Sequence, residues 1–155
     1  MATNKRSVWV DAGVLIIRVA VSMVFVFHGS QKLFGLFDGP GLKGFATALD
    51  GMGVPVPILS AILAASAEFF GGLAVLTGIG LRLATLPMIF TMIVAIVKAH
   101  PGAYSLQKGG MEYALTLGLV LLGLALTGPG RFVVWRPSGR RATREAPPEV
   151  RASDA

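Results

Sequence analysis

The chain has 155 residues and a formal net charge of +6, and 54% of its residues are hydrophobic whereas only 14% are charged. Soluble domains are about one-quarter charged, so this composition, with a mean hydropathy of +0.70, predicts an integral membrane protein. The chain contains no cysteine, which excludes disulfide bonds, thiol nucleophiles and cysteine-ligated metal clusters. We therefore expect no intrinsic cofactor, and any redox chemistry would need a bound carrier or a partner protein.

Four apolar stretches approach the 20 or so residues that a helix needs to cross a bilayer. They cover residues 8–27, 56–79, 83–99 and 111–127. The first contains Arg18 and is too long for a signal peptide, so we expect it to be retained. The third contains Pro87, which a first turn tolerates and which would kink a helix interior. The pattern predicts an all-α polytopic protein, an up-and-down bundle of four transmembrane helices.

The distribution of basic residues predicts the topology. Nine Lys and Arg residues lie on the side of the two termini and four lie on the opposite side, with Arg18 inside a span. The positive-inside rule places both termini in the cytoplasm, and the same bias explains the net charge without nucleic-acid binding. Residues 136–155 are rich in Pro, Arg and Glu, so we expect a disordered cytoplasmic tail after a membrane domain of residues 1–135.

The loop between the first two spans contains a short amphipathic segment. Apolar residues recur there at helical spacing, with polar residues on the other side. The apolar ones are Leu42, Phe45, Ala46 and Leu49, and the polar ones are Lys43, Thr47 and Asp50. We expect an interfacial helix at the outer face of the membrane.

Polar side chains from three predicted spans should meet at the same outer face. The first span ends in "FHGSQK", the third ends at His100, and the fourth begins with Glu112 and Tyr113. Helix ends are often polar, and Lys32 or Tyr113 could simply anchor the protein in the interface. We nevertheless predict one outer-facing ligand pocket. Its residues would be His28, Gln31, Glu68, His100, Glu112 and Tyr113.

Two charged residues lie deeper in the spans. Arg18 and Glu68 would both be roughly 15 Å below the outer face, from the rise of about 1.5 Å per residue. Because an isolated charge in hydrocarbon costs several kcal/mol, we predict that they form a buried ion pair at the floor of the pocket. The pair would either fix the packing of the bundle or let Glu68 relay a proton or hold a bound headgroup.

The second span also carries a narrow face of small residues. Ser60, Ala64, Glu68 and Gly72 recur every four residues, and further small residues lie beside them. Small residues let neighbouring helices approach closely. We therefore predict that this span is the central packing helix.

Four motifs together resemble the DoxX family of small bacterial membrane proteins. They are "HGSQKLFG" at 28–35, "AEFFGGLAVLTGIGLR" at 67–82, "KGGMEYAL" at 108–115 and "GPG" at 128–130. The resemblance covers about residues 12–135 and implies a four-helix bundle in the bacterial inner membrane, with members linked to quinone-coupled sulfur oxidation and to oxidative stress. It implies no settled catalytic residues, so we assign none. The matching positions are His28, Gln31, Lys32, Glu68, Gly71, Gly72, Arg82, Gly110 and Glu112.

Three functions remain open at this stage. The first is a redox-associated subunit that binds a quinone or similar lipid-soluble ligand and is at most an accessory part of an oxidoreductase. The second is a small transporter with a path along Arg18 and Glu68. The third is a scaffold without ligand chemistry. We expect the lipid bilayer as surroundings, redox proteins or a second copy of the chain as candidate partners, and no metal site, because the His and Glu residues lack metal-binding spacing.

Overall fold

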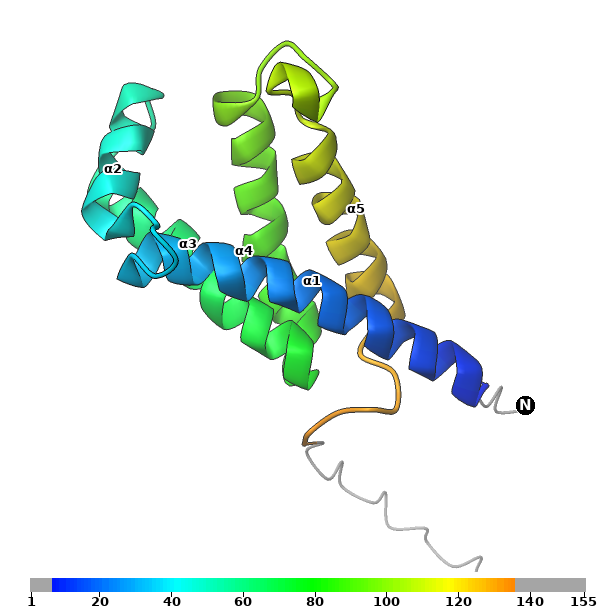
Figure 1. Ribbon diagram of the computed structural model, residues 1–155. Coiled ribbons are helices and arrows are strands. Elements are labelled where there is room, and N and C mark those ends of the chain that lie inside the picture. Colours follow the sequence, from blue (N-terminus) through cyan, green and yellow to red (C-terminus); the bar gives the residue numbers. More distant parts are fainter. Residues whose placement is uncertain (1–6, 136–155) are drawn as a thin grey trace, which may run out of the picture.

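The computed structural model describes residues 7–135, and this part of the chain is all-helical (Figure 1). The tail predicted for residues 136–155 lies outside the described residues. The helices are α1 (Val8–Phe34), α2 (Gly41–Gly51), α3 (Pro57–Thr77), α4 (Leu81–Val94) and α5 (Glu112–Thr127), with a π-helical turn η1 (Ala95–Ala99) and a 3-10 turn η2 (Leu106–Lys108). The predicted all-α fold of the membrane type is confirmed.

Three helical segments are long and apolar enough to cross a membrane: α1, α3 and the continuous segment Leu81–Ala99 formed by α4 and η1. α5 is equally apolar in character but has only 16 residues. At about 1.5 Å per residue it is roughly 24 Å long, which is shorter than the roughly 30 Å hydrocarbon layer. The fourth crossing therefore stays a prediction.

α1 is longer than the sequence predicted, because it continues to Phe34 rather than ending at residue 27. It begins after Ser7, whose hydroxyl accepts a hydrogen bond from the amide of Trp9, and it ends at Gly35, whose φ of 69° requires the left-handed conformation that glycine favours. Between residues 28 and 34 no proline interrupts the helix. The polar motif that starts at His28 is thus the last two turns of α1.

Glycines bring α1 and α3 into close contact. A Cβ atom at Gly29 of α1 would lie only 2.5 Å from the backbone nitrogen of Phe69 in α3, and one at Gly72 would lie 2.9 Å from a methyl group of Val26. The preceding residue of α3, Gly71, faces α4, and a Cβ atom there would clash with the side chain of Met88. α3 is therefore packed on both sides through small residues, which confirms its predicted central role.

α4 and α5 run together at an angle to the pair formed by α1 and α3 (Figure 1). Met92 of α4 lies beside Gly118 of α5, and buried residues of both helices, such as Leu81 and Leu121, belong to one apolar core. Pro87 lies inside α4 rather than in its first turn. Because proline has no amide hydrogen, it cannot donate to the carbonyl group of residue 83.

α2 is amphipathic as predicted and lies against the first half of α3. Ala46 and Leu49 are buried there with Ala61 of α3, and Leu42 and Phe45 pack around them. Lys43 and the other predicted polar residues are exposed. α2 thus covers the part of α3 that extends past the end of α1.

Candidate functional site

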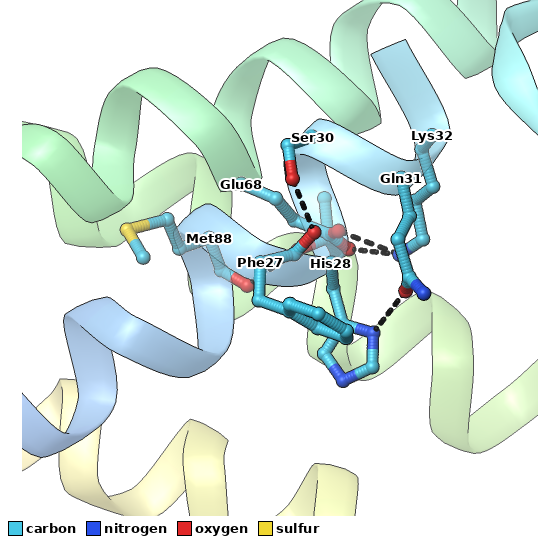
Figure 2. A network of polar contacts seen from close by, with 8 residues as sticks. Phe27, His28, Ser30, Gln31, Lys32, Glu68 and Met88 are labelled. Atoms are coloured by element: carbon cyan, nitrogen blue, oxygen red, sulfur yellow. Dashed lines mark hydrogen bonds and ion pairs between the residues drawn. The ribbon is translucent and has the colours of Figure 1, made fainter. Parts of the chain in front are cut away.

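An ion pair joins the last turn of α1 to the middle of α3. The ammonium nitrogen of Lys32 lies 2.6 Å from each carboxylate oxygen of Glu68 (Figure 2). The Glu68 side chain is only 4% exposed and that of Lys32 is 25% exposed. On the other side, the ammonium group lies 5.0 Å from the ring centre of Phe45, so α2 covers the pair through a cation–π contact.

The predicted ion pair between Arg18 and Glu68 is wrong. Arg18 is 1% exposed, and its guanidinium group donates hydrogen bonds to carbonyl oxygens. The acceptors are Val75 (2.8 Å), Leu76 (2.6 Å), Pro129 (2.8 Å) and Phe132 (2.5 Å). The reason is register: with Gly29 packed on Phe69, Glu68 lies level with the end of α1, whereas Arg18 lies level with the end of α3.

A largely apolar cavity of about 820 Å³ opens beside the ion pair. It lies between α2, α3, α4 and the η1 turn, and both Lys32 and Glu68 line it. The apolar walls are formed by Phe45, Leu49, Met52, Val54, Pro55, Leu63, Ala64, Ala67, Pro87, Phe90, Ile93, Val94, Ala95, Val97 and Ala99. We call this space the Lys32–Glu68 cavity.

A second group of polar residues lines the cavity near η1. The Nδ1 atom of His100 lies 2.9 Å from the carbonyl oxygen of Gly109, so it must carry the hydrogen, and a neutral His100 keeps Nε2 as an acceptor. The ammonium group of Lys98 donates to the carbonyl of Gly53 over 3.5 Å, across the connection that follows α2. π-Helical turns are rare in proteins, and those that do occur are often found at functional sites. Here the turn η1 brings Lys98 and His100 to the cavity.

His28 and Gln31 form a separate contact outside this cavity. His28 Nδ1 lies 3.1 Å from the side-chain oxygen of Gln31 (Figure 2). The side-chain amide nitrogen of Gln31 donates a hydrogen bond to the carbonyl of Phe37. The His28 ring also packs edge-on against Phe27. These contacts stabilise the end of α1 and the turn after it.

Glu112 and Tyr113 also lie outside the cavity. The Glu112 carboxylate accepts a hydrogen bond from the amide of Leu106 and so braces the η2 loop, and Tyr113 is 43% exposed. The structure therefore corrects the predicted grouping: Glu68 and His100 line one cavity, and the other four residues do not.

Sequence reasoning assigned Lys32 to the interface and missed it as the partner of Glu68. A signal was present, because Lys32 is one of the positions that match the family motif, but the pairing depends on the register of two helices. Within residues 7–135, no three His, Asp or Glu side chains are grouped so that they could hold a metal ion.

Comparison with known proteins agrees with the fold. Residues 13–101, which include both members of the ion pair, match the DoxX family. An uncharacterized membrane protein of Mycobacterium tuberculosis, Rv3486, is 32% identical over 84% of this chain and 83% of its own length. The Escherichia coli inner membrane protein YqjF is 31% identical over 81% of this chain and 92% of its own.

A third relative carries a name that mentions activity. The "Putative oxidoreductase CatD" of Bacillus subtilis is 29% identical over 82% of this chain and 87% of its own length. No solved structure matches the chain. The family match covers more than half of the chain, and the helices are apolar enough for a bilayer. The chain is thus a membrane protein that belongs to the DoxX family.

Proposed function

We propose that the protein binds a lipid-soluble carbonyl compound of the quinone type in the Lys32–Glu68 cavity, as an accessory subunit of a membrane redox system. One observation carries this proposal: a cavity of about 820 Å³ with apolar walls holds a buried ion pair. Ligand sites typically combine apolar walls with a few polar groups that orient the ligand.

The ion pair suits both redox states of such a ligand. Lys32 is a hydrogen-bond donor and would hold a quinone carbonyl oxygen, and Glu68 is an acceptor and would hold the hydroxyl group of the reduced form. The two groups are 2.6 Å apart, so small shifts of the ligand would exchange one partner for the other. The apolar walls would hold the ring and the tail.

The redox association rests on the printed name of the relative CatD. A partner protein would supply the electrons for the quinone. In this proposal the chain supplies the binding site, and the partner supplies the electron transfer.

The two alternative functions differ in what they require of the cavity. A transport path along Arg18 and Glu68 needs both residues to face the same space, and Arg18 is instead bonded to four carbonyl groups away from the cavity. A scaffold needs no ligand in the cavity, so ligand binding distinguishes it from the proposal.

We further propose that the protein lies in the bacterial inner membrane with four crossings and both termini in the cytoplasm. Two relatives from Escherichia coli, YqjF and YphA, are named inner membrane proteins. The excess of nine basic residues over four on the side of the termini supports this orientation.

The experiment fills the cavity without touching the ion pair. Ala67 lines the cavity, whereas Leu73 on the same helix is exposed and does not. We expect Ala67→Phe to weaken binding of a short-tailed ubiquinone or menaquinone by at least about tenfold, since about 1.4 kcal/mol of lost contact has that effect. The matched variant Leu73→Phe should bind like the original protein.

Thermal unfolding in detergent should be recorded for both variants, and Ala64→Leu serves as a second filling variant if Ala67→Phe does not fold. Quinone extracted with the purified protein gives an independent measurement. If the unfilled protein binds neither quinone, or if a folded Ala67→Phe or Ala64→Leu variant binds as well as the original protein, the scaffold function is favoured.

A further inference from the structure

A second cavity lies at the other end of the helices. It has a volume of about 840 Å³ and lies between the turn from α3 to α4 and the segment that follows α5. Its lining includes two arginines, one aspartate and a tryptophan among aliphatic and glycine residues: Asp11, Gly78, Ile79, Gly80, Leu81, Arg82, Leu83, Thr127, Gly128, Pro129, Gly130, Arg131, Val133 and Trp135. We call it the arginine-lined cavity. It shares no residue with the Lys32–Glu68 cavity.

Two guanidinium groups lie at this cavity without a partner among residues 7–135. Arg82 comes from the first turn of α4 and Arg131 from the segment after α5, and both are exposed. Within residues 7–135, neither guanidinium group makes a hydrogen bond or an ion pair. Among the lining residues that the structure describes, the one carboxylate belongs to Asp11, which is buried, so the exposed charge of these residues is positive.

The position of Arg82 depends on a glycine. The guanidinium group passes over Gly128, where an added Cβ atom would be 3.2 Å from its Nη2 atom. Gly128 also has a φ of 75°, which other residues rarely adopt. A larger residue at position 128 would thus crowd the Arg82 guanidinium group where it lines the cavity.

The cavity lies at the ends of the apolar helices, where we expect a bilayer to present its headgroups. It is built from the end of α3, the start of α4 and the end of α5. The only two tryptophans of the chain, Trp9 and Trp135, lie at this end and are 82% and 59% exposed. Tryptophan is enriched at membrane interfaces, because its ring is apolar and its N–H group is polar.

We infer that the arginine-lined cavity binds the phosphate of an anionic glycerophospholipid. Guanidinium groups hold phosphate through paired hydrogen bonds, and two of them come here from separate segments. The start of α4, which no side chain caps, adds the positive end of its dipole. The aliphatic walls formed by Ile79, Leu83 and Val133 would contact the glycerol and the upper acyl chain.

A lipid suits these features better than a soluble anion does. A soluble phosphate would use the two arginines but would leave the aliphatic walls exposed to water. A headgroup that is already in the bilayer fills both parts of the cavity at once. This inference does not depend on the quinone proposal, which concerns other residues at the other end.

The test uses the full-length chain, purified in a nonionic detergent and stripped of lipid. Binding of phosphatidylglycerol, phosphatidylcholine and inorganic phosphate is measured by native mass spectrometry and thermal shift. The variant Arg82→Gln with Arg131→Gln removes both guanidinium groups. The matched control Lys43→Gln with Lys108→Gln removes two exposed charges away from the cavity.

We expect phosphatidylglycerol to bind more tightly than phosphatidylcholine. The double arginine variant should lose about 25-fold in affinity for it, since each basic residue near an anionic lipid contributes a factor of about five. The lysine control should stay within twofold of the original protein. A cooperative thermal unfolding transition, recorded for each variant without lipid, shows that the variant is folded.

Three results would overturn the inference. They are equal binding of the two lipids, an arginine variant that keeps its affinity within twofold, and a lysine control that loses as much as the arginine variant. If inorganic phosphate alone stabilises the protein as much as phosphatidylglycerol does, the site binds a free anion and the lipid assignment is wrong.

Discussion

Two cations on α1, Arg18 and Lys32, are held in opposite ways against α3, Arg18 at the end of that helix and Lys32 at its middle. Arg18 is surrounded by backbone carbonyl oxygens and closes a packed junction. Lys32 has a single carboxylate partner, Glu68, and lies beside an open cavity. A buried charge in a membrane helix is therefore not by itself a mark of function, because its surroundings decide whether it packs or remains accessible.

The difference follows from the chemistry of the two side chains. A guanidinium group has five donors in one plane, so it can bond several carbonyl groups at once, and the end of α3 is the negative end of that helix's dipole. An ammonium group is a compact charge that a single carboxylate can satisfy. Arg18 thus joins α1, α3 and the segment after α5 through hydrogen bonds, whereas Lys32 joins α1 to α3 through one ion pair and contacts α2 through the ring of Phe45.

The largest effect should come from Arg18. Replacing it with Met removes four hydrogen bonds and leaves buried carbonyl groups unpaired, so we expect a loss of about 3–5 kcal/mol in the free energy of unfolding. Arg18→Lys should lose less, because it keeps the charge and some of the donors. Thermal unfolding in detergent measures both, and a harmless Arg18→Met would show that the junction does not depend on the guanidinium group.

The Lys32–Glu68 pair should give smaller and unequal effects. Lys32→Met leaves a carboxylate that is only 4% exposed, and we expect it to cost about 2–4 kcal/mol. Glu68→Gln leaves an ammonium group that is 25% exposed and can still reach water, at a cost of about 1–2 kcal/mol.

The double variant, Lys32→Met with Glu68→Gln, should cost less than the sum of the two single ones, because neither charge is then left alone. Additive costs in a double-mutant cycle would mean that the two side chains do not interact in the membrane.

Two glycines of α1, Gly29 and Gly13, test the register of α1 against α3, which keeps Arg18 and Lys32 apart. Gly29→Ala would place a Cβ atom 2.5 Å from the backbone of Phe69, so we expect it to destabilise the protein by about 1–3 kcal/mol. Gly13 on the same helix has no atom within 4 Å of an added Cβ. Gly13→Ala should leave stability unchanged or raise it by up to about 1 kcal/mol. Equal effects of the two changes would contradict the close packing of α1 on α3.

Reporter fusions show which loops and termini face the cytoplasm. We expect no effect of these fusions on the stability of the protein. A reporter that is active only in the cytoplasm should be dark after residue 45 and after residue 105, and active after residue 150, since nine basic residues lie on the terminal side against four. A dark fusion at residue 150 together with a dark one at 105 would show that the 16-residue α5 does not cross.

Features that depend on one segment could be predicted from the sequence, and features that depend on two could not. The apolar stretches, the amphipathic α2 and the small residues of α3 follow from local spacing, and the structure contains them. The partner of Glu68 could not be found in this way. It depends on α1 continuing to Phe34 and on Gly29 fitting against Phe69, which together set the register of the two helices.

The cavity shows the same limit. Glu68 and His100 could be singled out as unusual residues near the membrane, but the walls beside them come from α2, α3, α4 and η1 together. Glu112 carried the same sequence signal and braces a loop instead. Charge and depth identify candidate residues, and only the packing of the helices distinguishes a ligand-facing group from a loop brace.

The unequal lengths of α1 and α5 have a consequence for the surrounding bilayer. At about 1.5 Å per residue, the 27 residues of α1 extend roughly 40 Å and the 16 residues of α5 roughly 24 Å. A hydrocarbon layer of about 30 Å fits neither, so a long helix tilts and a short one draws the lipid surface inward. With α5 as the proposed fourth crossing, the protein should therefore thin the membrane locally beside α5 and favour lipids with shorter acyl chains there.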